Sequence, residues 1–268
     1  MTHNIQCIDK ALVARRFAHS RSTYEREASV QRQVAEKMMR LLTETMQAEG
    51  VTPAELSARF RHVVELGCGT GSFSRILWSR LKPESLLLND LCPEMEECVE
   101  ALCTSPSVRF HPGDAEMLDF PGGTDLIASC STLQWFNNPA AFFARCHCSL
   151  TTDGILAFST FGAENMKQIR QLTGNGLNYL PLHRLEEMLA PHFHILHAEE
   201  EIVSLPFDNP IAVLKHLKQT GVTGTEKKVW TRGRLEAFCN EYIRRFGNEK
   251  GKVELTYHPI YLIVQKRK

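Results

Sequence analysis

After residue 63 the chain alternates short β-rich runs with helical stretches, and this rhythm limits the possible folds more than any other feature. The first five β-rich runs cover residues 63–66, 86–88, 108–110, 126–128 and 154–161. Helical stretches between them cover residues 72–81, 93–103 and 139–150. Strands that alternate with helices form a parallel sheet with helices on both faces. We therefore expect an α/β fold with a Rossmann-like, mostly parallel sheet.

Beyond residue 161 the segments are longer and less regular. Two long β runs, 194–205 and 253–265, bring the expected sheet to seven strands. Further helices are expected at residues 163–172, 182–189, 209–219 and 231–246. We interpret about 162–192 and 206–250 as helical lid insertions within a main domain of residues 56–268.

The N-terminal segment is helical. Residues 9–50 carry helical periodicity, Ser29 is placed to cap a helix, and Gly50 is placed to end it. We therefore expect residues 1–55 to form a helical extension that covers the site of the main domain.

Composition excludes several classes of protein. Of the 268 residues 43% are hydrophobic and 23% are charged, which suits a packed core. Lys plus Arg and Asp plus Glu both count 31, which gives no argument for a nucleic-acid partner. Residues 1–10 lack an apolar core and no stretch reaches membrane length, so we expect neither a secretory signal nor a membrane span. The nine cysteines resemble reduced thiols, so we expect a cytoplasmic location. Neither they nor the eleven histidines have metal-binding spacing, so we expect no metal.

A glycine-rich turn joins the first β run to the first helix after it. Its sequence is Glu65-Leu66-Gly67-Cys68-Gly69-Thr70-Gly71. Such a turn lets the backbone approach a ligand closely and presents the amides of a helix N-terminus. The spacing is G-x-G-x-G, whereas a dinucleotide site prefers G-x-G-x-x-G. The third glycine therefore comes one residue early for a pyrophosphate.

Three acidic residues accompany the turn. Glu65 precedes the first glycine by two residues, where a carboxylate repels a pyrophosphate and suits a ligand with an ammonium and a sulfonium group. Asp90 ends the second β run, where an acid binds ribose hydroxyls in a doubly wound sheet. Asp114 follows the third run, beside Ala115, and is placed to accept a hydrogen bond from an adenine amino group.

The order E-x-G-x-G-x-G, then Asp90, then Asp114, resembles the class I S-adenosylmethionine (SAM)-dependent methyltransferases over about residues 60–265. The resemblance implies the Rossmann-like fold of that class and SAM as cofactor. The implied cofactor-binding residues of the motifs are Glu65, Gly67, Gly69, Gly71, Asp90, Asp114 and Ala115. The alternative is a structural glycine turn in a related fold that has lost its ligand.

Stretches outside these motifs resemble a narrower family. They are Tyr24-Glu25-Arg26-Glu27-Ala28-Ser29-Val30-Gln31, Gln134-Trp135, Asn175-Gly176-Leu177-Asn178-Tyr179-Leu180, Leu217-Lys218-Gln219-Thr220-Gly221 and Leu255-Thr256-Tyr257-His258. Together they resemble the malonyl-[acyl-carrier-protein] O-methyltransferases, which methylate a malonyl carboxylate early in biotin synthesis. In one departure, Ser129-Cys130 stands where that family often has Ser-Asn, which puts in doubt a side-chain amide role there.

This resemblance implies roles for five further residues. Tyr24 either packs in a helix or closes over the cofactor or the malonyl group. Trp135 either packs in the core or lines the substrate site. Gln31 is either a solvated helix residue or a cofactor contact, and Met95 packs, with adenine as one candidate partner. Ser131 is expected to contact the cofactor. We assign Tyr24 and Trp135 to catalysis and include Tyr24 among the cofactor contacts.

The reaction implied is methyl transfer to a carboxylate, which is ionised near pH 7 and needs no general base. Malonyl-acyl carrier protein, or malonyl-CoA, is the expected partner of a monomeric enzyme. Another small carboxylate such as aconitate, a quinone-like or nucleobase acceptor, and a silent methyltransferase-like scaffold subunit remain as alternatives.

An acidic carrier protein needs a local basic patch, because the total charge is zero. The candidates in the insertions are Arg170, Arg184, Lys215, Lys218, Lys227, Lys228, Arg232 and Arg234. Taken singly, each of these residues is more simply a solvated member of a helix face.

Overall fold

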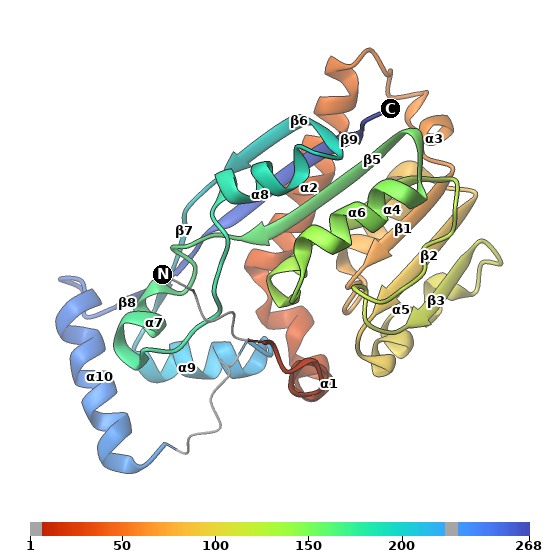
Figure 1. Cartoon of the computed structure of the whole chain (residues 1–268). Helices are drawn as coiled ribbons and strands as arrows, with labels where there is room; N and C mark the ends of the chain where they lie inside the picture. Colours follow the sequence, from red (N-terminus) through yellow and green to blue (C-terminus); the bar gives the residue numbers. More distant parts are fainter. Residues whose placement is uncertain (1–6, 223–229) are drawn as a thin grey trace.

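The computed structural model describes residues 7–222 and 230–268. Its large sheet has the order β3-β2-β1-β4-β5-β9-β6 (Figure 1). The strands are β1 (His62–Leu66), β2 (Ser85–Asp90), β3 (Val108–Pro112), β4 (Thr124–Ser129), β5 (Leu150–Phe161), β6 (Phe193–Glu200) and β9 (Pro259–Lys266). β9 runs antiparallel to both of its neighbours, and the pairs from β3 to β5 are parallel. The prediction of a seven-stranded, mostly parallel sheet is confirmed.

The strand order reverses between β1 and β4, which are neighbours in the sheet. From β1 the chain proceeds to β2 and β3 on one side, and from β4 it proceeds to β5 on the other. In open α/β sheets the crevice outside the carboxyl ends of the strands at such a reversal is where ligands bind. The topology therefore predicts a ligand site at the carboxyl ends of β1 and β4.

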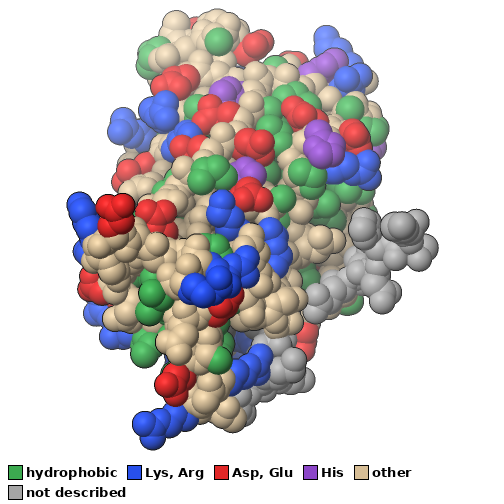
Figure 2. Space-filling model, turned by 90° about the vertical axis from the view of Figure 1, so that its left-hand side faces the viewer, with side chains coloured by type: hydrophobic (Ala, Val, Ile, Leu, Met, Phe, Trp, Pro, Cys, Tyr) green, Lys and Arg blue, Asp and Glu red, His purple; other side chains and the backbone are tan. Residues whose placement is uncertain are grey.

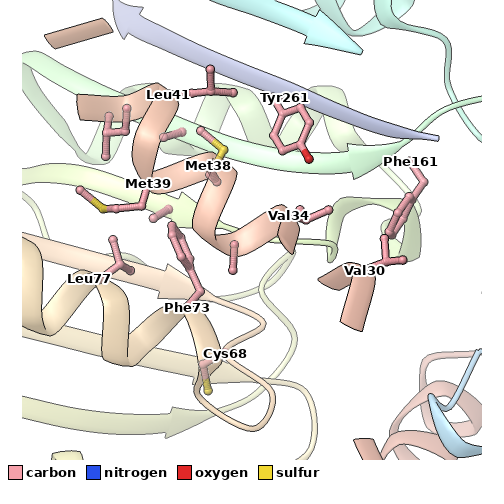
Figure 3. Packing of buried hydrophobic residues seen from close by; sticks show 14 of the residues in the cluster. Val30, Val34, Met38, Met39, Leu41, Cys68, Phe73, Leu77, Phe161 and Tyr261 are labelled. Atoms are coloured by element: carbon pink, nitrogen blue, oxygen red, sulfur yellow. The ribbon is translucent and has the colours of Figure 1, made fainter. Parts of the chain in front are cut away.

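Helices cover both faces of this sheet. One face carries α2 (Ser29–Ala48), α4 (Ser72–Leu81) and α5 (Glu96–Cys103), and the other carries α6 (Pro139–Ser149) and α8 (Leu182–Leu189). Because side chains alternate along a strand, Val63 packs with the first group and Val64 with the second. Figure 3 shows Met38 and Met39 of α2 close to Phe73 and Leu77 of α4.

The remaining elements form a smaller region beyond one end of the sheet (Figure 1). They are α7 (Lys167–Thr173), β7 (Val203–Phe207), α9 (Pro210–Gln219), α10 (Arg232–Phe246) and β8 (Val253–Tyr257). The N-terminal α1 (Lys10–Glu27) packs against α9, and the Thr23 hydroxyl donates a hydrogen bond of 2.9 Å to the Gln219 carbonyl. Three short elements complete the described chain: α3 (Leu56–Arg59), η1 (Pro93–Met95) and η2 (Leu133–Trp135).

The two long β runs expected at residues 194–205 and 253–265 are wrong as single strands. Each is broken, and β7 pairs with β8 in a separate two-stranded sheet. The second break falls at His258, whose backbone N–H donates to Asn165 Oδ1 and whose carbonyl accepts from the Gly162 N–H. Pro259 has no N–H to continue the ladder. These local hydrogen bonds redirect the chain from one sheet to the other.

The prediction that Ser29 caps a helix is also wrong. Ser29 is the first residue of α2, and Ala28, which is buried, stands at the cap position without a side-chain hydrogen bond. Gly50 follows the end of α2 with φ +85°, as expected for a terminating glycine. The helix of residues 163–172 begins later than expected, at Lys167. The domain boundary at residue 55 stays a prediction, although α2 itself packs on the sheet.

Candidate active site

A cavity lies at the carboxyl ends of β1, β2, β3 and β4, with α1 forming its outer wall. It encloses about 710 Å³ of empty space, which includes open solvent and lies in the size range of small-molecule sites. Nine of the predicted site residues line it together: Tyr24, Gly67, Gly69, Asp90, Met95, Asp114, Ala115, Ser131 and Trp135. The structure therefore brings most of the predicted set into one place, while the role of each residue stays a prediction.

The three glycines of the turn have different surroundings. A Cβ on Gly67 would stand 2.2 Å from Thr132 Oγ1, and a Cβ on Gly71 would stand 2.8 Å from Val99 Cγ1. A Cβ on Gly69 would meet nothing within 4 Å, and this glycine has φ +53°. Gly67 and Gly71 are thus needed for packing, whereas Gly69 lies on the cavity wall and leaves its space open. Gly71 does not line the cavity.

Asp90 is held by backbone amides at the end of β2. Its Oδ2 accepts from the Gly69 N–H at 2.8 Å, and its Oδ1 accepts from the Cys92 N–H at 2.9 Å. Burial raises the pKa of this carboxyl to about 6, against the lowering effect of the two amides. Each oxygen keeps a second lone pair, so Asp90 can still accept hydroxyl protons from a ligand.

Glu65 lies beneath the turn and does not line the cavity. Its side chain is 1% exposed, and none of the described residues offers its Oε2 a hydrogen-bond partner. Burial raises the pKa of this carboxyl to about 8, and the nearby Asp90 charge adds to the increase. Any effect on a bound cation is therefore electrostatic and acts through the turn.

Asp114 is paired with a residue that the motif reading missed. Lys10 Nζ lies 2.9 Å from Asp114 Oδ1 and 2.7 Å from Glu116 Oε2, and it sits 4.9 Å from the Phe136 ring centroid. Glu116 also accepts the backbone amides of Asn137 and Asn138. Lys10 thereby fastens the start of α1 to the loop after β3.

Aromatic side chains cover the cavity. The Phe17 ring lies 6.2 Å from the Tyr24 ring and 5.6 Å from the Trp135 ring, both in edge-to-face contact. Burial raises the pKa of the Tyr24 hydroxyl, and the Asp90 charge adds to the shift. Tyr24 therefore stays protonated at neutral pH and acts as a hydrogen-bond donor rather than a base.

Three buried polar atoms on the cavity residues have no hydrogen-bond partner among the described residues. They are Thr70 Oγ1, Asn89 Oδ1 and Ser131 Oγ. Unsatisfied buried polar atoms are costly, and a ligand can supply the missing partners. Ser131 also has φ +55°, a strained conformation that is frequent at functional sites. An amphipathic ligand with polar groups and a flat base fits this set.

Gln31 lies apart from the cavity. It lines a smaller adjoining hollow, together with Tyr24, Ser131 and Trp135. A separate, larger cavity is lined in part by Gln134, Phe136 and Tyr179.

Sequence reasoning missed Lys10, Phe17, Asn89 and Cys130, all of which line the main cavity. Asn89 directly precedes Asp90 at the end of β2, and that position was a usable signal. Lys10 and Phe17 of α1 had no local signal, because their contributions depend on where that helix folds back.

Within the described ranges, no cluster of His, Cys, Asp and Glu is arranged to hold a metal ion. No described helix is long and apolar enough to cross a membrane.

Comparisons with known proteins agree with this arrangement. A family model described as a methyltransferase domain matches residues 64–158. The solved structure of YcgJ from Bacillus subtilis superposes with a TM-score of 0.59 at 17% identity, over 87% of this chain and 99% of that one. The fold and the cavity define a class I methyltransferase domain.

Relatives along the whole chain narrow the class. The malonyl-[acyl-carrier protein] O-methyltransferase of Bacteroides helcogenes is 63% identical over 97% of this chain and 100% of its own length. The proteins of the same name from Bacteroides thetaiotaomicron and Haemophilus influenzae are 48% and 39% identical, over 97% and 98% of this chain and 100% and 96% of their own lengths. The chain belongs to this family of SAM-dependent methyltransferases.

Proposed function

We propose that this chain binds SAM in the cavity under α1 and transfers a methyl group to the free carboxylate of malonyl-acyl carrier protein. The observation that supports cofactor binding best is the pair of unpartnered atoms at Thr70 and Asn89 beside the open face of Gly69. The acceptor is supported by the names of relatives that match nearly the whole chain. The methyl ester would open the pimeloyl branch of biotin synthesis.

The residues divide the binding work between polar and apolar contacts. Asp90 would accept the ribose hydroxyls, since its carboxylate is fixed by the Gly69 and Cys92 amides. Asp114 and Ala115 lie where the adenine would bind, with Met95 as an apolar wall. Glu65 lies buried beneath the turn with a raised pKa, and a bound cation would favour its ionised form.

The reaction requires alignment and the exclusion of water. When bound, SAM supplies an electrophilic methyl group on a positively charged sulfur. Phe17, Tyr24 and Trp135 would cover the reacting region, and the protonated Tyr24 hydroxyl would donate a hydrogen bond to orient the acceptor carboxylate. A malonyl carboxylate is ionised at neutral pH, so no side chain has to remove a proton.

A basic face for the carrier protein is available on the smaller region. Figure 2 shows Lys and Arg side chains over the lower part of the face that α9 and α10 help to form. Lys215 and Lys218 of α9 and Arg232 of α10 are exposed, and Arg234 lies over the Trp230 ring at 5.3 Å. We call these four residues the basic face.

The other four predicted docking residues do not belong to the basic face. Arg184 lies on α8, which packs against α6 and β6, and it pairs with Glu187. Its side chain therefore belongs to the layer over the sheet rather than to the smaller region. Lys227 and Lys228 lie outside the described residues. Arg170 donates to the Ala163 carbonyl and lines a hollow beside the site.

A panel of acceptors tests the proposal against its main alternative, a free small carboxylate. We expect kcat/KM to be highest for malonyl-carrier protein, lower for malonyl-CoA, and near background for malonate and aconitate. Acetyl-carrier protein, which lacks the carboxylate, should not react. Turnover of a free dicarboxylate at a rate equal to that of malonyl-carrier protein would favour the alternative.

A further inference from the structure

A small hollow lies beside the cofactor cavity. It shares Phe17, Tyr24, Ser131 and Trp135 with the cofactor cavity. Its remaining wall includes Gln31 of α2 and Tyr179 of the loop before α8. An acceptor group in this hollow would therefore lie directly beside the cofactor. We call it the acceptor chamber.

Among the described residues, the walls of the acceptor chamber carry no charged side chain. Two of their polar atoms, Gln31 Oε1 and Ser131 Oγ, are buried and have no partner among the described residues. The oxygen and nitrogen of a side-chain amide can exchange places by rotation, so Gln31 can present donors as well. Hydroxyl and amide donors without a neighbouring acid suit an anionic oxygen. A cationic amine would lack a carboxylate to pair with.

The acceptor chamber is smaller than the cofactor cavity. It encloses about 320 Å³ of empty space, which includes open solvent, against about 710 Å³ for the cofactor cavity. A terminal carboxylate fits this space, and its uncharged hydrogen-bond donors suit that group. Beyond Tyr179 a further hollow continues to Arg170, the one charged side chain in the part of its lining that the structure describes. An acyl group can thus extend from the chamber toward the region of the basic face.

We propose that the acceptor chamber binds the terminal carboxylate of the acyl acceptor, with Gln31 and Ser131 as its hydrogen-bonding partners and Tyr179 as the limit on acyl length. This inference rests on the proposed function. It moves Gln31 from the cofactor contacts, where the sequence placed it, to the acceptor contacts. It also gives the malonyl group a defined position relative to the cofactor cavity.

The first test introduces a negative charge into the chamber. Gln31→Glu should raise the KM for malonyl-carrier protein at least tenfold and leave the Kd for S-adenosylhomocysteine within twofold of the parent. Gln33→Glu makes the same change at an exposed position of α2 and should alter neither value. Thermal melting and product binding establish that each variant is folded.

The second test changes the acyl length that the chamber accepts. Tyr179→Ala should raise the ratio of kcat/KM for succinyl-carrier protein to that for malonyl-carrier protein at least tenfold, while Tyr179→Phe, which keeps the ring, should not. Suppose that the parent is active but that Gln31→Glu has an unchanged KM, or loses affinity for S-adenosylhomocysteine and for the acceptor equally. The acceptor chamber would then be wrongly assigned, and the proposed function would stand. No transfer to malonyl-carrier protein by the parent would overturn the proposed function and the chamber with it.

Discussion

At the scale of single residues, Asp90 connects the cofactor turn to solution pH. Its pKa is raised to about 6 by burial, and ligand hydroxyls that donate to the carboxylate favour the ionised form. Binding therefore releases a proton below pH 6 and does not do so well above it. We expect the affinity for S-adenosylhomocysteine to fall as pH decreases through 6, by up to about tenfold per pH unit.

Substitution of Asp90 tests whether this carboxylate causes the pH dependence. Asp90→Asn should bind S-adenosylhomocysteine about 1.5–3 kcal/mol more weakly at pH 7.5, and its affinity should not decrease further at low pH. Asp119→Asn, at an exposed site, should match the parent in calorimetry at each pH. A parent affinity that is constant between pH 5 and 7.5 would contradict the assignment of Asp90.

The Tyr24 hydroxyl is a second residue whose role can be isolated. Tyr24→Phe keeps the ring against Phe17 and removes the donor, so turnover should fall about tenfold or more while the melting temperature barely changes. Tyr242→Phe is the matched control, because the Tyr242 hydroxyl donates at 2.8 Å to the Glu254 carbonyl away from the site. It should lower stability without lowering turnover. Full turnover in Tyr24→Phe would return Tyr24 to a packing role.

Site residues that belong to the glycine turn or to a strand end were predictable from the sequence. Residues that distant segments bring to the cavity were not. Gly69 and Asp90 stand at strand ends, where the local pattern and the doubly wound topology place ligand contacts. Lys10 and Phe17 reach the cavity because α1 folds back over it, which no periodicity within α1 reveals. Gln31 was predicted to be functional from a family motif, but its position beside the cavity required the structure.

At the scale of elements, α1 covers the cavity and is held at its start by Lys10. Lys10→Met would remove the cation between Asp114 and Glu116, which are both largely buried. We expect binding of S-adenosylhomocysteine to weaken by about 1 kcal/mol, roughly fivefold, and hydrogen exchange to increase over residues 10–20. Arg15→Met, at an exposed position of α1, should change neither. Unchanged exchange in Lys10→Met would show that other contacts hold α1.

The breaks in the strands show where local patterns are insufficient. The runs at 194–205 and 253–265 have continuous β propensity, but β7 and β8 leave the large sheet to form their own. The switch depends on Asn165 and Gly162, which hydrogen-bond the backbone of His258 from far along the chain. By contrast α8, α9 and α10 were predicted to within one residue, since their caps and periodicity are local.

At the scale of the whole molecule, the fold and the identity of the methyl acceptor are inferred from different observations. The cyclase SpnF superposes on this chain with a TM-score of 0.50 at 16% identity, so the same fold supports a different reaction. The family assignment depends on relatives that match the entire chain, including α1 and the smaller region. Of those parts, α1 supplies Phe17 and Tyr24 to the acceptor chamber and the smaller region carries the basic face, whereas Ser131 of the chamber comes from the loop after β4.

The basic face predicts a salt dependence that differs between two substrates. Docking of an acidic carrier protein is screened by salt, whereas malonyl-CoA lacks the carrier surface. Between low and moderate ionic strength, kcat/KM should fall more steeply for malonyl-carrier protein than for malonyl-CoA. Replacing both Lys215 and Lys218 with Glu should reduce kcat/KM about tenfold for the carrier substrate alone. Docking at this face would be contradicted if kcat/KM had the same salt dependence for both substrates and if the double variant lost the same factor with both.

The measurement that tests the central claim most directly is intact mass spectrometry of malonyl-carrier protein after incubation with the enzyme and SAM. The account predicts the addition of one methyl group, located by fragmentation on the terminal carboxylate of the malonyl group and removed by mild base. The Asp90→Ala and Tyr24→Phe variants should form this product more slowly. An unmodified malonyl group, or a methyl group on a side chain of the carrier protein, would contradict the claim.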